Sequence, residues 1–494
     1  AQRMNAGARL ARASLGFAGG VVTPGIADQR VIFLLTEALA VLGPADSALK
    51  ARLLSRLAME YRYSPFQEKR EDLSREAVEI ARRLGDHATL VFAMNARHYA
   101  ILGPDTLEQR MALSIELAQL AEQTGDWELT LQSLPWRLAD LLDLGHVRAV
   151  DEAIESSARL ADALRQPIYL WYIHTFQALR ALMKGQFMEG ERLAVAAHTL
   201  GQRVQPGAAD VYYAAQMFVL RREQRRLGEM EKPLQNVLEQ YPAMPVLQAM
   251  LTLVYWQTER IAETQAELTR LCANRAEALP WDQLWLGAVA ILAEVATLLA
   301  DRASAITLYE LLLPYAQRNI VVGVPICLGA AATYLGCLAT TLKDWSVAVQ
   351  HFEEALIINA RLGTPPFLAR TQYYYSAMLL ARKQGADREK AFQLLEQAHD
   401  MAQELGMSHL MEQIQRLLVG EPLREPSLPT PHGLTAREAQ VLQLIAAGRS
   451  TKEIAAALFI SNPTVERHIT HIYQKIGARS RAEATAFALR HGLG

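Results

Sequence analysis

Apolar residues recur at three- and four-residue spacing along most of this chain, from about residue 31 to residue 420. That spacing gathers them on one face of an α-helix. Long β-branched runs that alternate with polar residues are absent, although strands would require them. Glycine-containing turns interrupt the helical pattern at Gly85, Gly125, Gly145, Gly185 and Gly363. The pattern therefore predicts an all-α protein built of consecutive helical hairpins.

The spacing of the turns suggests that these hairpins are stacked. Gly85 and Gly125 are 40 residues apart, and Asp301 and Asp344 are 43 residues apart. Two helices in each such interval predict an α-solenoid over residues 31–420. The clearest unit, 344–385, has small and aromatic residues at helical spacing and resembles a tetratricopeptide repeat. Its interval is longer than the usual one of about 34 residues, so we describe the region as tetratricopeptide-like.

Residues 434–494 carry a different pattern, in which helix-capping signals follow one another closely. The inferred helices are Thr435–Ala447, Thr451–Leu458, Asn462–Ile476 and Arg481–His491. Three pairs fit a capping box, in which a hydroxyl and a carboxylate satisfy each other's backbone N–H groups: Thr435 with Glu438, Ser450 with Glu453, and Ser480 with Glu483. Gly448 and Gly477 stand where the first and third helices should end. The short break after the second helix predicts a helix-turn-helix.

The third of these helices has two faces. Its core face consists of Val465, Ile469, Ile472 and Ile476, which fall within one narrow arc. The opposite face and its flanks consist of Pro463, Glu466, Arg467, Thr470, His471 and Gln474. One arginine among short polar groups is what a helix presents to the major groove of DNA. The alternative is the solvated face of an ordinary helix.

A longer motif favours DNA. Its residues are Leu434-Thr435, Arg437-Glu438, Val441-Leu442, Gly448, Lys452-Glu453-Ile454-Ala455, Leu458, Ile460-Ser461, Thr464-Val465, His468, Ile472, Lys475, Gly477 and Arg481. In order and spacing this motif resembles the LuxR-type helix-turn-helix domain, which implies four helices and operator binding. The DNA contacts expected are Lys452, Ser461, Asn462, Thr464, Glu466, Arg467, Thr470, His471, Gln474 and Lys475. Many family members carry Lys or Arg directly after Thr-Val, whereas this chain has Glu466-Arg467. The main groove contact is therefore expected from Arg467.

Two segments flank the predicted solenoid. Residues 421–433 contain four prolines between Gly420 and Gly433 and no apolar period, which predicts a semi-extended linker. Residues 1–30 show no obvious helix cap at their end and are interpreted as the remnant of a longer chain. A solenoid followed by a LuxR-type domain resembles the large ATP-dependent regulators similar to the maltose-regulon activator. Their N-terminal ATPase is missing here, and the sequence leaves open whether it lies upstream.

Composition narrows the chemistry. The chain has 494 residues and a net charge of −2, but residues 434–494 hold eight Lys and Arg against four Asp and Glu, a net charge of +4. Because residues 434–494 are basic and the rest of the chain is acidic, contact with DNA phosphates is expected at the C-terminal region. Cys272, Cys327 and Cys337 lack metal or redox spacing, so we expect reduced, buried thiols in a cytoplasmic protein. Phosphate-loop, metalloprotease and nucleophile-elbow motifs are absent, so neither enzymatic activity nor a cofactor is expected.

One uncharged stretch calls for a membrane check. No charged residue occurs for 24 positions between Arg318 and Lys343, a length that could span a bilayer. Pro325 and the many small residues of this stretch favour a buried solenoid helix instead, and no membrane contact is expected.

Aromatic clusters are the remaining feature of the predicted solenoid. Their usual role is to fill a core, but some could line a ligand site because Tyr and Trp combine flat apolar area with a polar tip. The candidates for an effector site are Tyr172, Tyr213, Trp256, Trp285 and Tyr374. The run Arg221-Arg222 and Arg225-Arg226 is expected to be a solvated charge run, with an anion or an acidic partner as the alternative.

Two functions fit these patterns. The first is a transcription regulator, with activation as the expected direction, that binds operator DNA as a homodimer. Its solenoid would sense a small-molecule or protein effector. The second is a tetratricopeptide-like interaction scaffold whose C-terminal module does not read DNA. Sequence-selective, salt-dependent DNA binding by residues 421–494 would separate the two.

Overall fold

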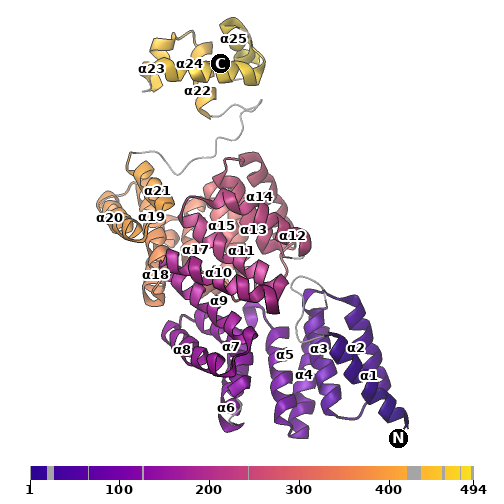
Figure 1. The fold of residues 1–494 in the computed structure, drawn as a ribbon. Helices are drawn as coiled ribbons and strands as arrows, with labels where there is room; N and C mark the ends of the chain where they lie inside the picture. The colour runs from indigo at the N-terminus through magenta and orange to yellow at the C-terminus, as the bar shows by residue number, and fades with distance from the viewer. Residues whose placement is uncertain are drawn as a thin grey trace.

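The computed structural model describes residues 2–18, 27–64, 66–124, 127–242, 244–419, 436–458, 462–478 and 480–490. Helices make up nearly all of these residues, and neighbouring helices along the chain pack side by side (Figure 1). The fold is all-α, as predicted, with a solenoid-like stack of helical hairpins before the C-terminal helices. The predicted linker, residues 421–433, lies outside the described residues.

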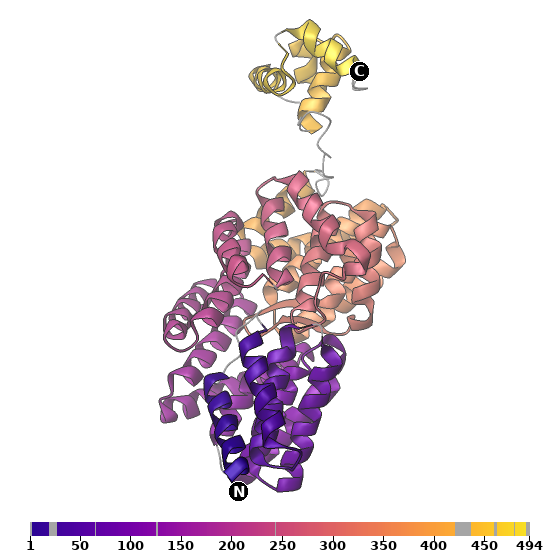
Figure 2. The ribbon, with the colours of Figure 1, turned by 90° about the vertical axis from the view of Figure 1, so that its right-hand side faces the viewer.

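The stack begins with five helices, coloured indigo to violet in Figures 1 and 2: α1 (Gln2–Ala18), α2 (Gln29–Leu42), α3 (Ala48–Glu60), α4 (Gln67–Leu84) and α5 (His87–Ala100). Ala11 of α1 shares a buried cluster with Leu35 of α2. The absence of a cap before residue 30 was a wrong expectation, because the Asp28 carboxylate accepts a hydrogen bond from the Arg30 backbone N–H at 2.8 Å and caps α2. The boundary drawn at residue 31 therefore falls inside a helix.

The middle of the stack continues with longer helices: α6 (Leu107–Thr124), α7 (Trp127–Asp143), α8 (Val147–Leu164), α9 (Pro167–Met183), α10 (Phe187–Val204), α11 (Pro206–Glu223), α12 (Glu231–Gln240), α13 (Pro245–Gln257) and α14 (Ile261–Ala276). Gly145 and Gly185 end α7 and α9 with φ of +76° and +75°, as their role as turn markers predicts. Short 3₁₀ turns occur at Tyr61–Tyr63, Pro104–Thr106, Leu227–Met230 and Leu313–Tyr315.

The last part of the stack contains the repeat that the sequence marks most clearly. Its helices are α15 (Trp285–Leu298), α16 (Arg302–Leu312), α17 (Ala331–Leu342), α18 (Trp345–Leu362), α19 (Pro365–Arg382), α20 (Asp387–Leu405) and α21 (Ser408–Leu418). Ala348, Phe352 and Ala355 of α18 are fully buried, as their spacing predicts. Gly336 of α17 lets the two helices approach closely, because a Cβ there would lie 2.7 Å from the Phe352 ring.

The uncharged stretch between Arg318 and Lys343 is only partly the helix that the sequence suggested. An antiparallel hairpin, β1 (Asn319–Val322) and β2 (Ile326–Ala330), precedes α17. The β-branched residues of β1 favour a strand, and Gly323 (φ +58°) with Pro325 makes the turn. The prediction of one continuous helix was therefore wrong for residues 319–330. In the described part of the chain no helix is both long and apolar enough to cross a membrane.

Candidate functional site

Four helices close the chain: α22 (Ala436–Ala446), α23 (Thr451–Leu458), α24 (Asn462–Ile476) and α25 (Arg481–Arg490). Their bounds agree with the sequence prediction to within one residue at each end. α22 packs against α24 and α25, and α23 packs against α24. The residues buried between them are Val441, Leu442, Ile445, Ile454, Ala455, Val465, Ile472, Ala484 and Ala488. These helices therefore have a core of their own.

The capping signals at the starts of α23 and α25 correspond to hydrogen bonds, and at α25 the Glu483 N–H donates to Ser480 Oγ at 3.2 Å. Ser450 and Glu453 make a complete capping box at the start of α23: the Ser450 N–H donates to Glu453 Oε2 at 2.8 Å, and the Glu453 N–H donates to Ser450 Oγ at 3.3 Å. The Ser450 N–H and then the Ser450 hydroxyl, which donates to Glu453 Oε2 at 2.8 Å, hold the pKa of Glu453 below its usual range. Gly448 and Gly477 have φ of +77° and +68° and end α22 and α24. Thr435 lies outside the described residues.

Helix α24 separates an apolar face from a polar one, as predicted. Val465 and Ile472 are completely buried, and Ile469 and Ile476 pack against the same cluster from its edge. Glu466, Thr470 and His471 are exposed. Of the other predicted contacts, Ser461 lies outside the described residues, as do the side chains of Asn462, Thr464, Arg467 and Gln474.

The two lysines expected to contact phosphate differ in their surroundings. Lys452 on α23 is exposed. Lys475 near the end of α24 is ion-paired, with Nζ 2.7 Å from Oε2 of Glu438 on α22. Only 5% of the Glu438 side chain is exposed, against 38% of the Lys475 side chain. Lys475 therefore ties α24 to α22 in addition to any role on DNA.

Helices packed around one small core, with an exposed polar face on the third, are the arrangement of a helix-turn-helix domain. The comparisons agree. Residues 432–488 match the family model described as bacterial regulatory proteins, luxR family. The spore germination protein GerE of Bacillus subtilis (strain 168) is 40% identical over 70 residues, which are 14% of this chain and 95% of that protein. The chain belongs to the LuxR family through this C-terminal DNA-binding domain.

In other relatives the matched stretch is a smaller share of the protein. The probable transcriptional regulatory protein NarL of Mycobacterium tuberculosis (strain ATCC 25618 / H37Rv) is 42% identical over 76 residues, 15% of this chain and 35% of that protein. The oxygen regulatory protein NreC of Staphylococcus aureus (strain JH9) is 48% identical over 60 residues, 12% of this chain and 28% of that protein. This chain thus spans about a third of the length of the NarL relatives.

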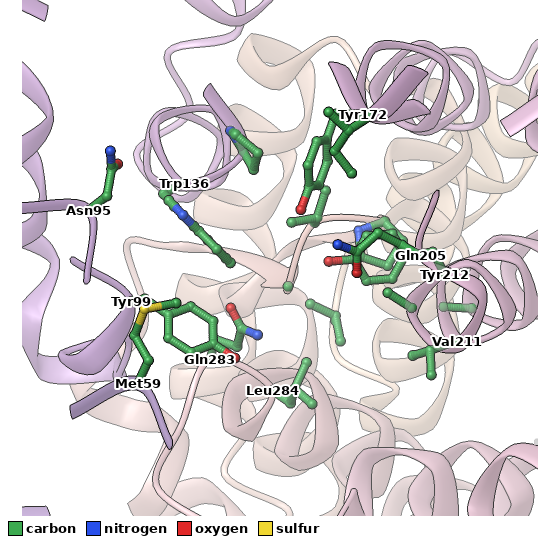
Figure 3. Close-up of a pocket in the computed structure, with 18 of the residues that line it drawn as sticks. Met59, Asn95, Tyr99, Trp136, Tyr172, Gln205, Val211, Tyr212, Gln283 and Leu284 are labelled. Atoms are coloured by element: carbon green, nitrogen blue, oxygen red, sulfur yellow. The ribbon is translucent and has the colours of Figure 1, made fainter. Parts of the chain in front are cut away.

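The helical stack holds a cavity of about 430 Å³, which contains one of the predicted effector residues. Its walls come from α3, α5, α7, α9, α11, α13, the segment before α15 and the turn between the two strands. Tyr172 of α9 directs its hydroxyl into this space, toward the side of Tyr99 and Gln283 (Figure 3). Burial raises the pKa of Tyr172 to about 12.

The other predicted effector residues lie elsewhere. Trp256 lines a second, more polar pocket of about 560 Å³ together with Arg225, His409 and Tyr373. Tyr213 stacks on His198, with ring centroids 4.5 Å apart. Neither Tyr213 nor the two remaining candidates lines either pocket.

Trp285 and Tyr374 are buried in helix packing. Trp285 is 3% exposed and packs on Trp281, with ring centroids 4.4 Å apart. Tyr374 is 5% exposed, and its hydroxyl donates to Glu294 Oε1 at 2.7 Å. Sequence reasoning missed Trp136 and Tyr99, which do line the 430 Å³ cavity. Nothing local marks them, because the cavity arises only where distant helices meet.

The arginine run is a solvated charge run only in part: Arg225 and Arg226 are exposed, as expected, whereas Arg222 at the end of α11 is not. Arg222 is 4% exposed and pairs with buried Glu294 of α15. The next residue, Glu223, pairs with buried Arg370 of α19. Burial alone would raise the pKa of Glu294, but the Arg222 and Arg370 guanidinium groups lower it below its usual range. Here the charges join three helices inside the stack.

Proposed function

We propose that this protein is a transcription regulator whose helical stack senses an effector and thereby controls operator binding by the C-terminal domain. The observation that carries the proposal is the division of α24 into a buried apolar face and an exposed polar face within a LuxR-family domain. A helix of this kind can enter the major groove while its other face stays packed on the domain.

The exposed residues of α24 and its neighbours divide by chemistry. Arg467 is the proposed base contact, because a guanidinium can donate two hydrogen bonds to guanine. Glu466 would accept from a cytosine amino group or orient Arg467. Thr470, His471 and Gln474 would complete the groove face, with Ser461, Asn462 and Thr464 at its start. Lys452 and Lys475 are the proposed phosphate contacts.

Operator binding is proposed to require two copies of the chain. One recognition helix makes few contacts, so a single C-terminal domain should bind weakly. Two copies on half-sites about one helical turn apart gain from a high effective concentration. The population of dimers would then set activity, and an effector can shift it only through different affinities for the two states. The helical stack, with its cavity at Tyr172, is the proposed place for that effector.

The test begins with a fragment of residues 421–494, which contains the whole C-terminal core. Duplexes selected from a random pool should bind it sequence-selectively, with an affinity that falls linearly with salt on a logarithmic scale. The second measurement compares the full chain with the fragment on the same duplex, with and without cell extract. If the full chain and the fragment bind the duplex with equal affinity under every condition, the stack does not control DNA binding. Failure to select any sequence would favour the interaction scaffold instead.

A further inference from the structure

The cavity around Tyr172 is larger than packing defects usually are. Protein interiors contain few voids bigger than a water molecule, whereas small-molecule sites have volumes of roughly 300–1,000 Å³. At about 430 Å³ the cavity falls in the second range. It is partly open to solvent and is lined by segments from Arg56 to Pro325, so a molecule inside it would touch both the first helices of the stack and the strand hairpin. Figure 3 shows the opposed walls, with Trp136 on one side and Tyr212 on the other.

The walls carry almost no charge. Among the described residues that line the cavity there is no Asp, Glu or Lys, and the only Arg is Arg56. The Arg56 guanidinium is already engaged: Nη2 lies 2.5 Å from Glu60 Oε1 and 2.9 Å from the carbonyl oxygen of Ala18. A charged ligand would therefore lose its hydration without gaining a counter-ion. A neutral ligand meets no such cost.

Several polar groups in the walls have hydrogen-bonding capacity to spare. No hydrogen bond joins the Tyr172 hydroxyl, or the side-chain amides of Gln205 and Gln283, to any residue that the structure describes. The side-chain oxygen of Asn95 is buried without a hydrogen-bond partner. Buried polar groups normally have partners, so the unpartnered Asn95 oxygen costs free energy, whereas the partly exposed Tyr172, Gln205 and Gln283 groups can bond to water. These groups are donors and acceptors that a ligand could satisfy.

We propose that this cavity binds a neutral, largely aromatic small molecule that carries at least one carbonyl or hydroxyl group. Its rings lie between Trp136 and Tyr212, and its polar group meets the Tyr172 hydroxyl and the neighbouring amides. That this ligand acts as an effector rests on the proposed function, but that it binds in the cavity does not. Ligand binding is measured without DNA, so the binding proposal and the proposed regulatory function can fail separately.

Benzophenone is a suitable probe because it is neutral and aromatic, has one carbonyl acceptor, and forms covalent bonds to nearby C–H groups under ultraviolet light. On the full chain we expect saturable labelling at one molecule per chain, in peptides that contain Tyr172, Val211 or Leu284. Its anionic analogue 4-benzoylbenzoate should bind at least about tenfold more weakly. Labelling spread over other surfaces, or equal binding of the anion, would overturn the proposal.

Two leucines provide a matched pair of blocking and control variants. Leu284 and Leu311 are both partly buried against the same core cluster, but only Leu284 lines the cavity. Leu284→Trp should fill part of the space and reduce benzophenone labelling about tenfold, whereas Leu311→Trp should leave it unchanged. Circular dichroism and melting temperature report whether each variant folds. Unchanged labelling in folded Leu284→Trp contradicts the site, and the peptide map of the wild-type chain decides the matter if that variant does not fold.

The polar part of the proposal has its own test. Tyr172→Phe keeps the ring and removes the hydroxyl, so benzophenone affinity should fall by about 2–10-fold, the typical worth of one hydrogen bond. Diphenylmethane has the same two rings without the carbonyl and should compete equally well in both proteins. Equal losses for the two compounds would mean that Tyr172 acts only through packing, and the carbonyl contact would be wrong.

Discussion

The two helical regions of this chain differ in how much of their charge is buried. In the stack, oppositely charged residues from distant helices meet in the interior, as Arg222 and Glu294 do on α11 and α15. In the C-terminal domain the core cluster is apolar, the one ion pair to a buried carboxylate described there joins Glu438 to the partly exposed Lys475, and Glu466 and Lys452 face solvent. Buried ion pairs cost desolvation and leave an uncompensated charge when one partner is lost, whereas exposed charges remain available to a partner. The buried charged residues of the stack therefore hold helices in position, whereas the exposed charged residues of the C-terminal domain can contact a partner.

The largest effect is expected where that internal charge is broken. Glu294→Ala leaves Arg222 buried without its carboxylate and removes the acceptor of the Tyr374 hydroxyl. Losing one partner of a buried pair costs about 3–5 kcal/mol, so the unfolding transition of the stack should shift strongly in chemical denaturation. The transition of the C-terminal domain should stay in place.

The matched control is an ion pair on the surface of the same stack. Glu263 pairs with Arg260 in the first turn of α14, with both side chains at least one-third exposed. Glu263→Ala should barely move the transition, because exposed pairs add little stability. Similar shifts for Glu294→Ala and Glu263→Ala would show that the buried network does not hold the three helices together.

The next effect concerns recognition rather than folding. Arg467→Ala should cost about 1–3 kcal/mol of discrimination between the selected duplex and a duplex changed at one base pair. The measurement is affinity for both duplexes at one salt concentration, with circular dichroism to confirm the fold. If the ratio of the two affinities is unchanged, the groove contact comes from another residue of α24.

The C-terminal domain was predictable almost in full because its signals are local. Ser450 with Glu453, and the glycines Gly448 and Gly477, act within one helical turn, so their roles could be read from neighbouring residues. The period of Val465 and Ile472 likewise needed only one helix. No tertiary information was required to assign the faces of α24.

The stack was predictable only in its repeating part. The hairpin at residues 319–330 was missed because an apolar run without charge looks the same in a buried helix and in a buried strand. The fate of Arg222 depends on Glu294, 72 residues away, and adjacent arginines look solvated when read alone. The cavity combines residues from Arg56 to Pro325, so only one of the five aromatic candidates, Tyr172, was placed in it.

A smaller effect is expected at the capping box of α23. Ser450→Ala removes the acceptor of the Glu453 N–H and should destabilise the C-terminal domain by about 1 kcal/mol. Because the folded-state pKa of Glu453 is depressed, its stabilising contribution is present above the usual glutamate range and is lost as pH falls below it. Ser450→Ala keeps the backbone N–H that donates to Glu453 but loses the hydroxyl that also donates to it, so the difference in stability between wild type and variant should narrow in acid by the contribution of that hydroxyl. A constant difference in thermal denaturation from neutral pH to below that range would exclude this role of the carboxylate.

The smallest effect separates the two lysines of the DNA-binding domain. Lys452→Ala should weaken all duplexes about equally and reduce the slope of log affinity against log salt by about one, as loss of one phosphate contact does. The Lys475 ammonium is already close to the Glu438 carboxylate, so it releases less counterion on binding, and Lys475→Ala should reduce the slope by less. The same change removes a cation from beside a buried carboxylate, so only Lys475→Ala should also lower the melting temperature of the domain. Equal slopes for both variants, with equal melting temperatures, would mean that the Lys475–Glu438 pair opens on DNA and contributes nothing to the fold.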